Sequence, residues 1–262
     1  MSAETGLYRR AIVRTPGSNF GDGLTTAQLG TPDHERALAQ HAAYVAALER
    51  CGVSVTCLPV DLDHPDSVFV EDTAILLSEC AILTRPGAPS RRGEVSAIRP
   101  ALARLYRDLS PIEPPGTLDG GDVCEADGHF LIGISERTNE EGALQLAAIL
   151  ARHGRTSALV DVRGIEGILH LKSGIGYLGE GRFAAIPALR EHPALGGSVS
   201  LTVDPDEAYA ANCVRVNDRL LVAAGFPKFR TALRGLGYEP LPLEMSEFER
   251  MDGGLSCLSL RF

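Results

Sequence analysis

The 262-residue sequence predicts an α/β fold in which five strand-turn-strand-helix units surround one axis as a five-fold pseudosymmetric propeller. Three observations carry this prediction. The same order of segments recurs along the chain: a polar residue that starts the unit, called the opener here, then an apolar strand, a short turn, a second strand and a helical segment. The openers recur every 39 to 51 residues, at Asp72, Asp122, Ser173, Asn212 and Ser256. The terminal "GGLSCLSLRF" and the opening "LYRRAIVRTP" would pair to complete a further unit.

The first helix is expected to take Thr31 as its cap and Pro32 in its first turn, and to end before Gly52. Its apolar face is predicted to consist of Leu38, Ala42, Val45 and Leu48. The unit that starts with "EDTAILLSECAILTRPG" continues into the helical "RRGEVSAIRPALARLYRDL". Pro100 inside that segment predicts a kink or a late helix start.

The unit "GGDVCEADGHFLIGISERTNEEGALQLAAILARHG" repeats this order, with Thr138 and Glu141 at capping-box spacing and Gly154 past the helix end. "KSGIGYLGEGRFAAIPALREHP" is a weaker copy. In "AANCVRVNDRLLVAAGFPKFRTALRGLG", the segment 216–219 suits a tight hairpin turn. Because the first and last strands would meet, we expect a single α/β-propeller domain over residues 1–262.

Composition narrows the class of partner. The chain carries a net charge of −9, with a pI near 5.3, and no block of Lys and Arg, which argues against nucleic-acid binding and favours a small-molecule partner. The N-terminus has no apolar segment of the secretory type, and no apolar run approaches the roughly 20 residues of a membrane helix. We therefore expect a cytoplasmic protein without a membrane partner.

The six cysteines are scattered, without a Cys-x-x-Cys pair or a histidine at metal-ligand spacing, so free thiols are expected in place of disulfides or a zinc finger.

The fold would bring the polar openers to one centre. It would gather Glu71, Asp72, Asp119, Asp122, His170, Asn212 and Cys257. Considered alone, Cys257 is typical of a small, buried, apolar side chain, and His170 is typical of a histidine in a protein core. Gly253 and Gly254 beside the cysteine favour a close backbone approach. A cysteine and a histidine from distant parts of the chain make a nucleophile and base pair one reading of the site.

Carboxylates are concentrated in two strings of this centre, "PDSVFVED" with Asp66, Glu71 and Asp72, and "TLDGGD" with Asp119 and Asp122. Each one separately could be a turn or cap residue. Together they predict a strongly anionic pocket that would attract a planar guanidinium and raise the pKa of a nearby thiol.

Basic residues near two helix starts oppose the helix dipole, and a bound carboxylate would explain them. These residues are Arg91, Arg92 and Arg137. A ligand with a guanidinium at one end and a carboxylate at the other is an arginine-like amino acid. A thiol that attacked the guanidinium carbon would release an amine, and water would then complete hydrolysis, with His170 transferring the protons.

Eight strings resemble the dimethylarginine dimethylaminohydrolases, of the guanidine-modifying superfamily with the five-fold α/β-propeller, or pentein, fold. They are "RTPGSNFGDGLTT", "PDSVFVED", "LTRPGAPSRRGE", "GTLDGGD", "RTNEEGA", "LHLKSG", "YAANC" and "DGGLSCLSLRF". The resemblance covers nearly the whole chain and suggests a bacterial member. It implies hydrolysis of asymmetric dimethylarginine and monomethylarginine to citrulline and dimethylamine or methylamine, through a covalent cysteine thiouronium.

The resemblance also implies roles for individual residues. Cys257 would be the nucleophile, His170 the general acid and base, and Asp119 its acidic partner. The implied substrate contacts are Asp66 and Asp72 at the guanidinium, Arg91 and Arg137 at the α-carboxylate, and the backbone of Leu24 and Met251 near the α-amine, with Phe69 and Glu71 as further contacts. It implies no cofactor or metal for turnover, and a homodimer is compatible with it.

One position departs from the bacterial pattern. Bacterial relatives tend to carry Glu at the position of Asp119, whereas animal members carry Asp there, as this chain does. The shorter side chain puts its contacts in question, although not its acidic role.

Two other functions compete with this one. Arginine deiminases and amidinotransferases act on related guanidines but are longer chains. A ribosome-associated binding protein shares the propeller without catalysis, although the negative charge argues against a ribosomal surface. Citrulline formed from dimethylarginine, from arginine or from neither would discriminate between the three.

Overall fold

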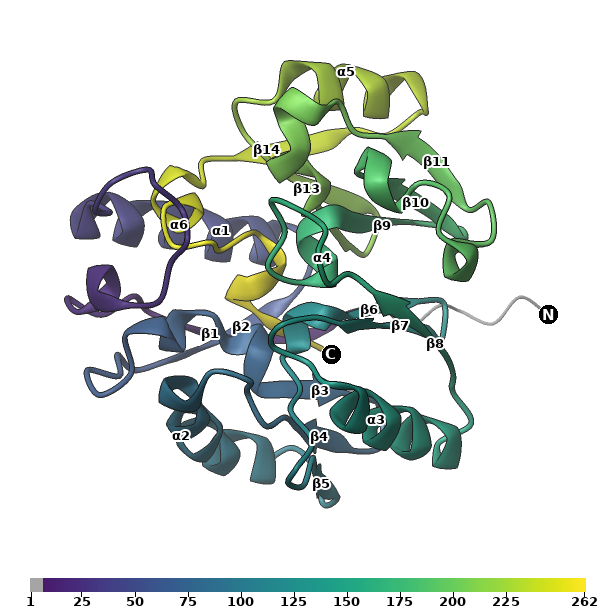
Figure 1. The fold of residues 1–262 in the computed structure, drawn as a ribbon. Coiled ribbons are helices and arrows are strands. Elements are labelled where there is room, and N and C mark those ends of the chain that lie inside the picture. The colour runs from purple at the N-terminus through teal and green to yellow at the C-terminus, as the bar shows by residue number, and fades with distance from the viewer. Residues whose placement is uncertain (1–6) are drawn as a thin grey trace.

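Five three-stranded sheets surround one axis in the computed structural model, which describes residues 7–262 (Figure 1). In every sheet the central strand pairs antiparallel with one neighbour and parallel with the other. The sheets are β15-β1-β2 (Leu260–Arg261, Arg10–Arg14, Ser54–Leu58), β3-β4-β5 (Ala74–Leu76, Ala81–Leu83, Leu109–Pro111), β6-β7-β8 (Val123–Ala126, His129–Ile134, Thr156–Asp161), β9-β10-β11 (Ile175–Gly179, Arg182–Ala185, Val199–Thr202) and β12-β13-β14 (Val214–Val216, Arg219–Ala223, Pro240–Leu243). This arrangement confirms the predicted five-fold propeller.

The ring closes through the two ends of the chain, as predicted. β15 pairs antiparallel with β1, with Ala11 opposite Arg261 and Ile12 opposite Leu260. The Arg10 amide also donates to the Phe262 carbonyl at 2.8 Å. The C-terminal segment, yellow in Figure 1, therefore runs into the middle of the molecule.

Helices connect each central strand to its parallel neighbour in four of the five sheets. They are α1 (His34–Arg50), α2 (Arg92–Ala103), α3 (Glu140–Arg152) and α5 (Pro227–Gly235). In the β9-β10-β11 sheet, two 3-10 turns, η6 (Pro187–Leu189) and η7 (Pro193–Leu195), take the place of a helix between β10 and β11. Among residues 7–262, no helix is both long and apolar enough to cross a membrane.

The predicted repeat unit lacked the third strand, which follows each helix. The missed strands gave weak signals because they are short or carry proline: β5 reads "LSP" and β14 reads "PLPL". The predicted hairpin turn is confirmed, since β12 and β13 pair Val216 with Arg219, and Asn217 between them has a φ of 56°.

α1 begins later than predicted. Asp33, and not Thr31, is its cap, because the Asp33 side chain accepts a hydrogen bond from the Arg36 amide at 2.9 Å. Gly52 follows the helix end with a φ of +82°, as expected.

The buried face of α1 also differs from the prediction. Ala42 is exposed, whereas the polar Gln40 is buried and bonds the Ser246 hydroxyl at 2.9 Å and the Glu247 amide at 3.1 Å. Apolar spacing alone missed this polar contact. The buried residues are Ala37, Gln40, His41, Tyr44, Ala47 and Leu48.

Two further helix starts correct the sequence predictions. Asn139 caps α3 and accepts from the Gly142 amide at 2.8 Å, so the predicted box at Thr138 is wrong, although Gly154 does follow the helix with a φ of +70°. α2 begins at Arg92 and contains Pro100 near its end, so the predicted late start is wrong as well.

We expect Asp33→Ala to lower the free energy of unfolding by about 1 kcal/mol, because the Arg36 amide loses its acceptor at the helix start. Thr31→Ala is the matched control and should change it by less than about 0.5 kcal/mol. Urea unfolding followed by circular dichroism measures both. Equal losses in the two variants would contradict the observed cap.

Candidate active site

The polar openers lie together at one end of the axis. Each lies in, or directly after, a short helical turn that precedes a strand of its sheet: η3 (Val70–Thr73), η5 (Gly120–Asp122), α4 (Leu171–Gly174), η8 (Pro205–Ala211) and η9 (Ser256–Leu258). η3 contacts both η9 and η5, α4 contacts η5, and η8 contacts α4. The ring of sheets thus brings five segments from the whole length of the chain to one place.

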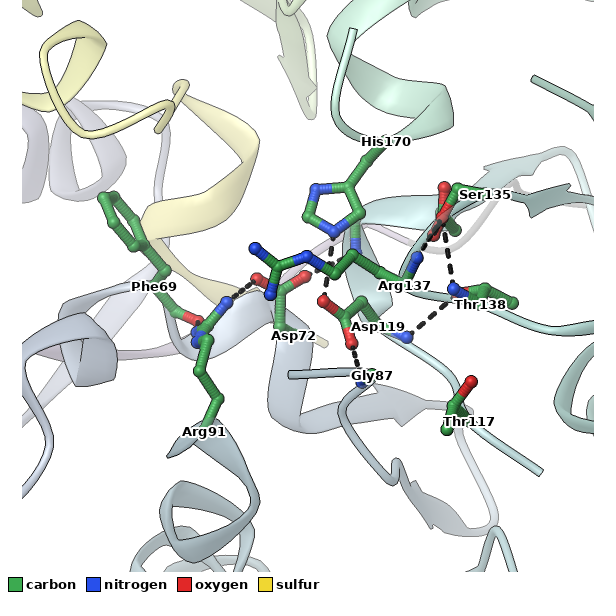
Figure 2. Close-up of polar contacts among 12 residues, drawn as sticks. Phe69, Asp72, Gly87, Arg91, Thr117, Asp119, Ser135, Arg137, Thr138 and His170 are labelled. Carbon is green, nitrogen blue, oxygen red and sulfur yellow. Dashed lines mark hydrogen bonds and ion pairs between the residues drawn. The ribbon is translucent and has the colours of Figure 1, made fainter. Parts of the chain in front are cut away.

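A buried histidine and carboxylate form the centre of this group (Figure 2). His170 Nε2 lies 3.1 Å from Asp119 Oδ2, and Asp119 is 0% exposed. The other Asp119 oxygen accepts from the Gly87 amide at 2.9 Å, and the Asp119 amide donates to the Thr138 hydroxyl at 3.1 Å. Asp119 therefore reaches His170 despite its shorter side chain, and its position is fixed from both ends.

Asp72 is the second buried carboxylate beside the imidazole. It accepts from Arg91 Nη1 at 2.5 Å and from the Gly121 amide at 2.7 Å. Burial alone would raise the pKa of Asp72, but the charges of Arg91 and His170 outweigh burial and lower this pKa to about 2. A side chain at Gly121 would clash with the imidazole, because its Cβ would lie 2.8 Å from His170 Cγ. Asp72 is therefore ionised and held at the imidazole.

The carboxylates around His170 determine its protonation state. Burial alone would lower the pKa of the imidazole. The negative charges of Asp122 and Asp72, together with the hydrogen bond to Asp119, outweigh burial and raise this pKa to about 9. Asp122 is itself held by the Leu171 amide at 2.9 Å and the Ser135 hydroxyl at 2.6 Å. At neutral pH the centre thus contains an imidazolium.

The two arginines expected at a ligand carboxylate have different surroundings. Arg91 is buried and donates to both Asp72 and Glu94 and to the backbone carbonyls of Asp66 and Phe69. In Figure 2, the Arg137 guanidinium points toward the Asp72 carboxylate and the His170 ring. Over residues 7–262, no protein acceptor bonds this half-buried guanidinium. Arg137 is thus available to a ligand, whereas Arg91 holds protein carboxylates.

Glu71 and its neighbour Asp72 contact different residues. Its carboxylate accepts from Lys172 Nζ at 2.6 Å, from the Ser256 hydroxyl at 2.7 Å and from Arg261 Nη2 at 3.4 Å. These groups line an axial cavity of about 130 Å³, which Cys124 also lines. Glu71 and Asp72, two of the carboxylates predicted to form an anionic pocket, thus each have a cationic partner.

Cys257 lies on η9, next to the residue that anchors this turn. Ser256 donates its amide to Asn212 Oδ1 at 3.0 Å, and its hydroxyl accepts from Asn212 Nδ2 at 3.1 Å. The half-buried thiol accepts from the Gly254 amide at 3.4 Å. Within the described part of the chain, no hydrogen bond joins this sulfur to the His170 ring. The anchoring fixes the turn, and the thiol shares the opener cluster with the imidazole.

The environment of Cys257 disfavours its anionic form. Burial and the negative charges of Glu71 and Asp72 raise the pKa of the thiol to about 12. The direction agrees with the sequence prediction, although burial is the largest cause.

The glycines before Cys257 are needed for space, as expected. A Cβ at Gly253 would lie 2.2 Å from the Phe69 ring, and one at Gly254 would lie 2.5 Å from Asn212 Cγ. The thiol-bearing turn therefore packs directly against its neighbours.

The other expected contacts form a group beside this centre. Asp66 accepts from the Leu24 amide at 3.0 Å, and burial raises the pKa of its carboxyl. The Met251 side chain packs near the same place, since its Cε lies 3.2 Å from where a Gly23 Cβ would stand. The structure thus brings Asp66, expected at the guanidinium, together with Leu24 and Met251, which were expected at the α-amine.

Sequence reasoning missed the residues that support this site. Glu94 is 2% exposed and pairs with Arg91 at 2.8 Å, and Lys172 pairs with Glu71. A signal existed for Glu94, because it stands three residues after Arg91 at a helix start. The Gly87 amide gave no comparable signal, since only the tertiary structure brings it to Asp119.

Comparison with known proteins agrees with this site. A family model described as "N,N dimethylarginine dimethylhydrolase, eukaryotic" matches residues 27–151. The N(G),N(G)-dimethylarginine dimethylaminohydrolase of Pseudomonas aeruginosa is 44% identical, over 98% of this chain and 100% of that protein. The enzyme of the same name from Streptomyces coelicolor is 38% identical, over 97% of this chain and 96% of its own.

Solved structures give the same relationship. A Pseudomonas aeruginosa dimethylarginine dimethylaminohydrolase, a cysteine-to-serine variant complexed with citrulline, superposes with a TM-score of 0.94 at 43% identity, covering 98% of this chain and 100% of that one. A histidine-to-glycine variant of a dimethylarginine dimethylaminohydrolase, an adduct with S-methyl-L-thiocitrulline, superposes at 0.93 with 44% identity, covering 98% of this chain and 100% of its own. The N-terminal domain of a cyanobacterial arginine dihydrolase shares the fold at 18% identity and a TM-score of 0.85, covering 96% and 97% of the two chains.

Full-length identity to two enzymes of one name, together with the fold and its central histidine and carboxylates, makes this chain a member of the dimethylarginine dimethylaminohydrolase family.

Proposed function

We propose that this protein hydrolyses Nω-methylated L-arginines to L-citrulline and dimethylamine or methylamine. The observation that carries the proposal is the buried pair of His170 and Asp119, which lies beside the ionised Asp72 in the same opener cluster as the half-buried Cys257. Citrulline, the proposed product, is bound by the related Pseudomonas aeruginosa variant. A relative of the family forms an adduct with S-methyl-L-thiocitrulline, a close analogue of the substrate.

The charges of the site select the two ends of such a substrate. The anionic Asp72 offers an acceptor to a guanidinium. Arg137 offers a free guanidinium to the α-carboxylate, and Arg91 contributes by holding Asp72 in place. Leu24 and Met251 are assigned to the α-amine end, where they pack beside Asp66. We assign Phe69 to the wall of the pocket, against the Gly253 backbone.

Catalysis starts from a neutral thiol and an imidazolium. Because the pKa of Cys257 is raised to about 12, its proton must leave to solvent when the cationic substrate binds and offsets the charges of Glu71 and Asp72. The thiolate then attacks the guanidinium carbon and forms a C–S bond. His170, protonated because its pKa is raised to about 9, gives its proton to the departing amine as the C–N bond breaks.

The second half of the reaction uses the same histidine in reverse. Neutral His170 takes a proton from water, and the resulting hydroxide adds to the thiouronium carbon. The carbonyl of citrulline forms as the C–S bond breaks, and the hydroxyl proton passes to the departing sulfur, which restores the neutral thiol. Asp119 keeps the imidazole oriented and stabilises its cationic form throughout. The chemistry transfers no electrons, so it needs no redox cofactor.

The proposal extends to the setting of the enzyme. We infer that residues 1–262 act as one catalytic domain, which the pairing of the first and last strands supports. We also infer action in the cytoplasm on a small-molecule substrate, in keeping with the net charge of −9 and the scattered thiols. A homodimer is the assembly we propose, and light scattering of the purified protein tests it.

The purified chain is expected to form citrulline from asymmetric dimethylarginine and monomethylarginine at rates well above those with arginine. Colorimetric citrulline assays at matched concentrations measure this. Arginine as the better substrate would point to a deiminase, and no citrulline from any of the three would exclude the proposed activity.

We expect Cys257→Ser to lose activity at least roughly a thousandfold, because serine lacks an accessible anion for the attack. Citrulline binding, followed by calorimetry, should remain. Cys57→Ser, at an exposed thiol on β2, is the matched control and should retain full activity. Substantial turnover by the Cys257 variant would contradict the covalent mechanism.

His170→Gln should lower kcat by about 10²-fold to 10⁴-fold, because the leaving amine and the attacking water lose their proton donor and acceptor. The affinity for citrulline should change only a few-fold. If affinity falls in parallel with kcat, His170 has a structural role instead.

Stability should depend on pH through the same histidine. Because its pKa is raised from 6.5 to about 9, protonated His170 stabilises the fold fully below about pH 6.5, and this contribution disappears as the pH rises through 9. The stability difference between the wild type and His170→Gln should therefore shrink by roughly 3 kcal/mol between about pH 6 and about pH 10. Urea unfolding at a series of pH values measures it, and a difference independent of pH would contradict the raised pKa.

A further inference from the structure

A second cluster of potential ligands lies away from the active site. One ligand atom each from Cys80, Asp108 and His153 lies within 4.8 Å of the others. The Cys80 sulfur is only 3.3 Å from His153 Nε2. Cys80 is fully buried, His153 is half-buried and Asp108 is exposed, so the cluster opens to solvent on one side.

The backbone holds these three residues from two neighbouring repeat units. Cys80 ends the turn before β4, where its carbonyl accepts from the Leu77 amide at 2.9 Å. Asp108 precedes β5, and its carbonyl accepts from the Ala81 amide at 3.1 Å. His153 is the C-cap of α3, which belongs to the next sheet. The cluster therefore spans the boundary between the β3-β4-β5 and β6-β7-β8 sheets.

The orientation of the imidazole suits a metal ligand. Its Nδ1 lies 3.5 Å from Glu79 Oε1, while Nε2 faces Cys80. The Glu79 carboxylate beside Nδ1 favours a proton on that nitrogen. That tautomer leaves the Nε2 lone pair directed into the cluster. A carboxylate behind a ligating histidine recurs in zinc sites and orients the ring.

We propose that Cys80, Asp108 and His153 bind a zinc ion, with water in the fourth position. One thiolate, one imidazole and one carboxylate suit zinc in a tetrahedral site. Zinc ligands at about 2.0 and 2.3 Å from the ion stand roughly 3.5 Å apart, close to the distance between the Cys80 sulfur and His153 Nε2. The ion joins two adjacent sheets, so its role is to stabilise the propeller, and it takes no part in turnover.

Binding replaces the proton of the thiol. Without an ion, the Cys80 thiol and His153 Nε2 share a hydrogen bond at 3.3 Å. Zinc displaces this proton to solvent and forms the Zn–S bond, without any change in oxidation state.

Cobalt(II) titration of the full-length Cys257→Ser chain tests the proposal. Cobalt occupies zinc sites and gives a near-ultraviolet charge-transfer band when a thiolate binds it, and the background removes the active-site thiol. We expect one cobalt ion per chain, displaced by zinc. Adding Cys80→Ala should abolish the band, and adding Cys57→Ala, the matched control at an exposed thiol, should leave it unchanged.

Variants of the other two ligands, and of the carboxylate behind His153, test the affinity for cobalt. His153→Ala and Asp108→Asn should each weaken cobalt binding, and Glu79→Gln should weaken it about tenfold or more by releasing the imidazole. Zinc should raise the Tm of the wild type and not that of Cys80→Ala. The proposal is overturned if the background chain shows no thiolate band, if the band survives Cys80→Ala, or if zinc shifts both Tm values equally. None of these outcomes depends on catalytic activity.

Discussion

Closure of the ring by the pairing of β15 with β1 is the constraint on which the active site depends. It places the last residues of the chain inside the molecule, where a terminus would otherwise fray. The same strand fixes the turn before it, because Ser256 is then held against Glu71 and Asn212. Cys257 is positioned through backbone that the fold already orders, so the thiol needs no loop of its own.

In the buried centre, the adjacent acidic residues Glu71 and Asp72 pair with different cations and face different groups. Asp72 is held by Arg91 and faces the imidazole, whereas the adjacent Glu71 faces the axial cavity and pairs with Lys172. Neighbouring residues of a helical turn point in different directions, which is how two adjacent carboxylates reach different partners. The site therefore buries several acids without leaving a large net charge, since a buried unpaired carboxylate would be costly.

The two groups of cysteine, histidine and aspartate differ in ways that match different chemistry. At the active site the imidazole is held by a buried carboxylate and the thiol stands on a separate turn, and no hydrogen bond joins the two among the described residues. In the second cluster the Cys80 sulfur lies 3.3 Å from His153 Nε2, and one atom of Asp108 lies within 4.8 Å of both. Direct contact between thiol and imidazole is thus the geometry on which the proposed metal site rests.

The sequence by itself determined the five-fold repeat, the closure of the chain and the residues of the centre, because hydrophobic alternation, glycines and the opener spacing are local signals. It also indicated the raised pKa of Cys257. Only the tertiary structure decided which acid meets which cation, as in the pairing of Arg91 with Asp72, since that depends on side-chain direction across separate sheets. The cap of α1 at Asp33, the short third strands and the approach of Cys80 to His153 likewise rest on contacts between residues distant in sequence or on weak local signals.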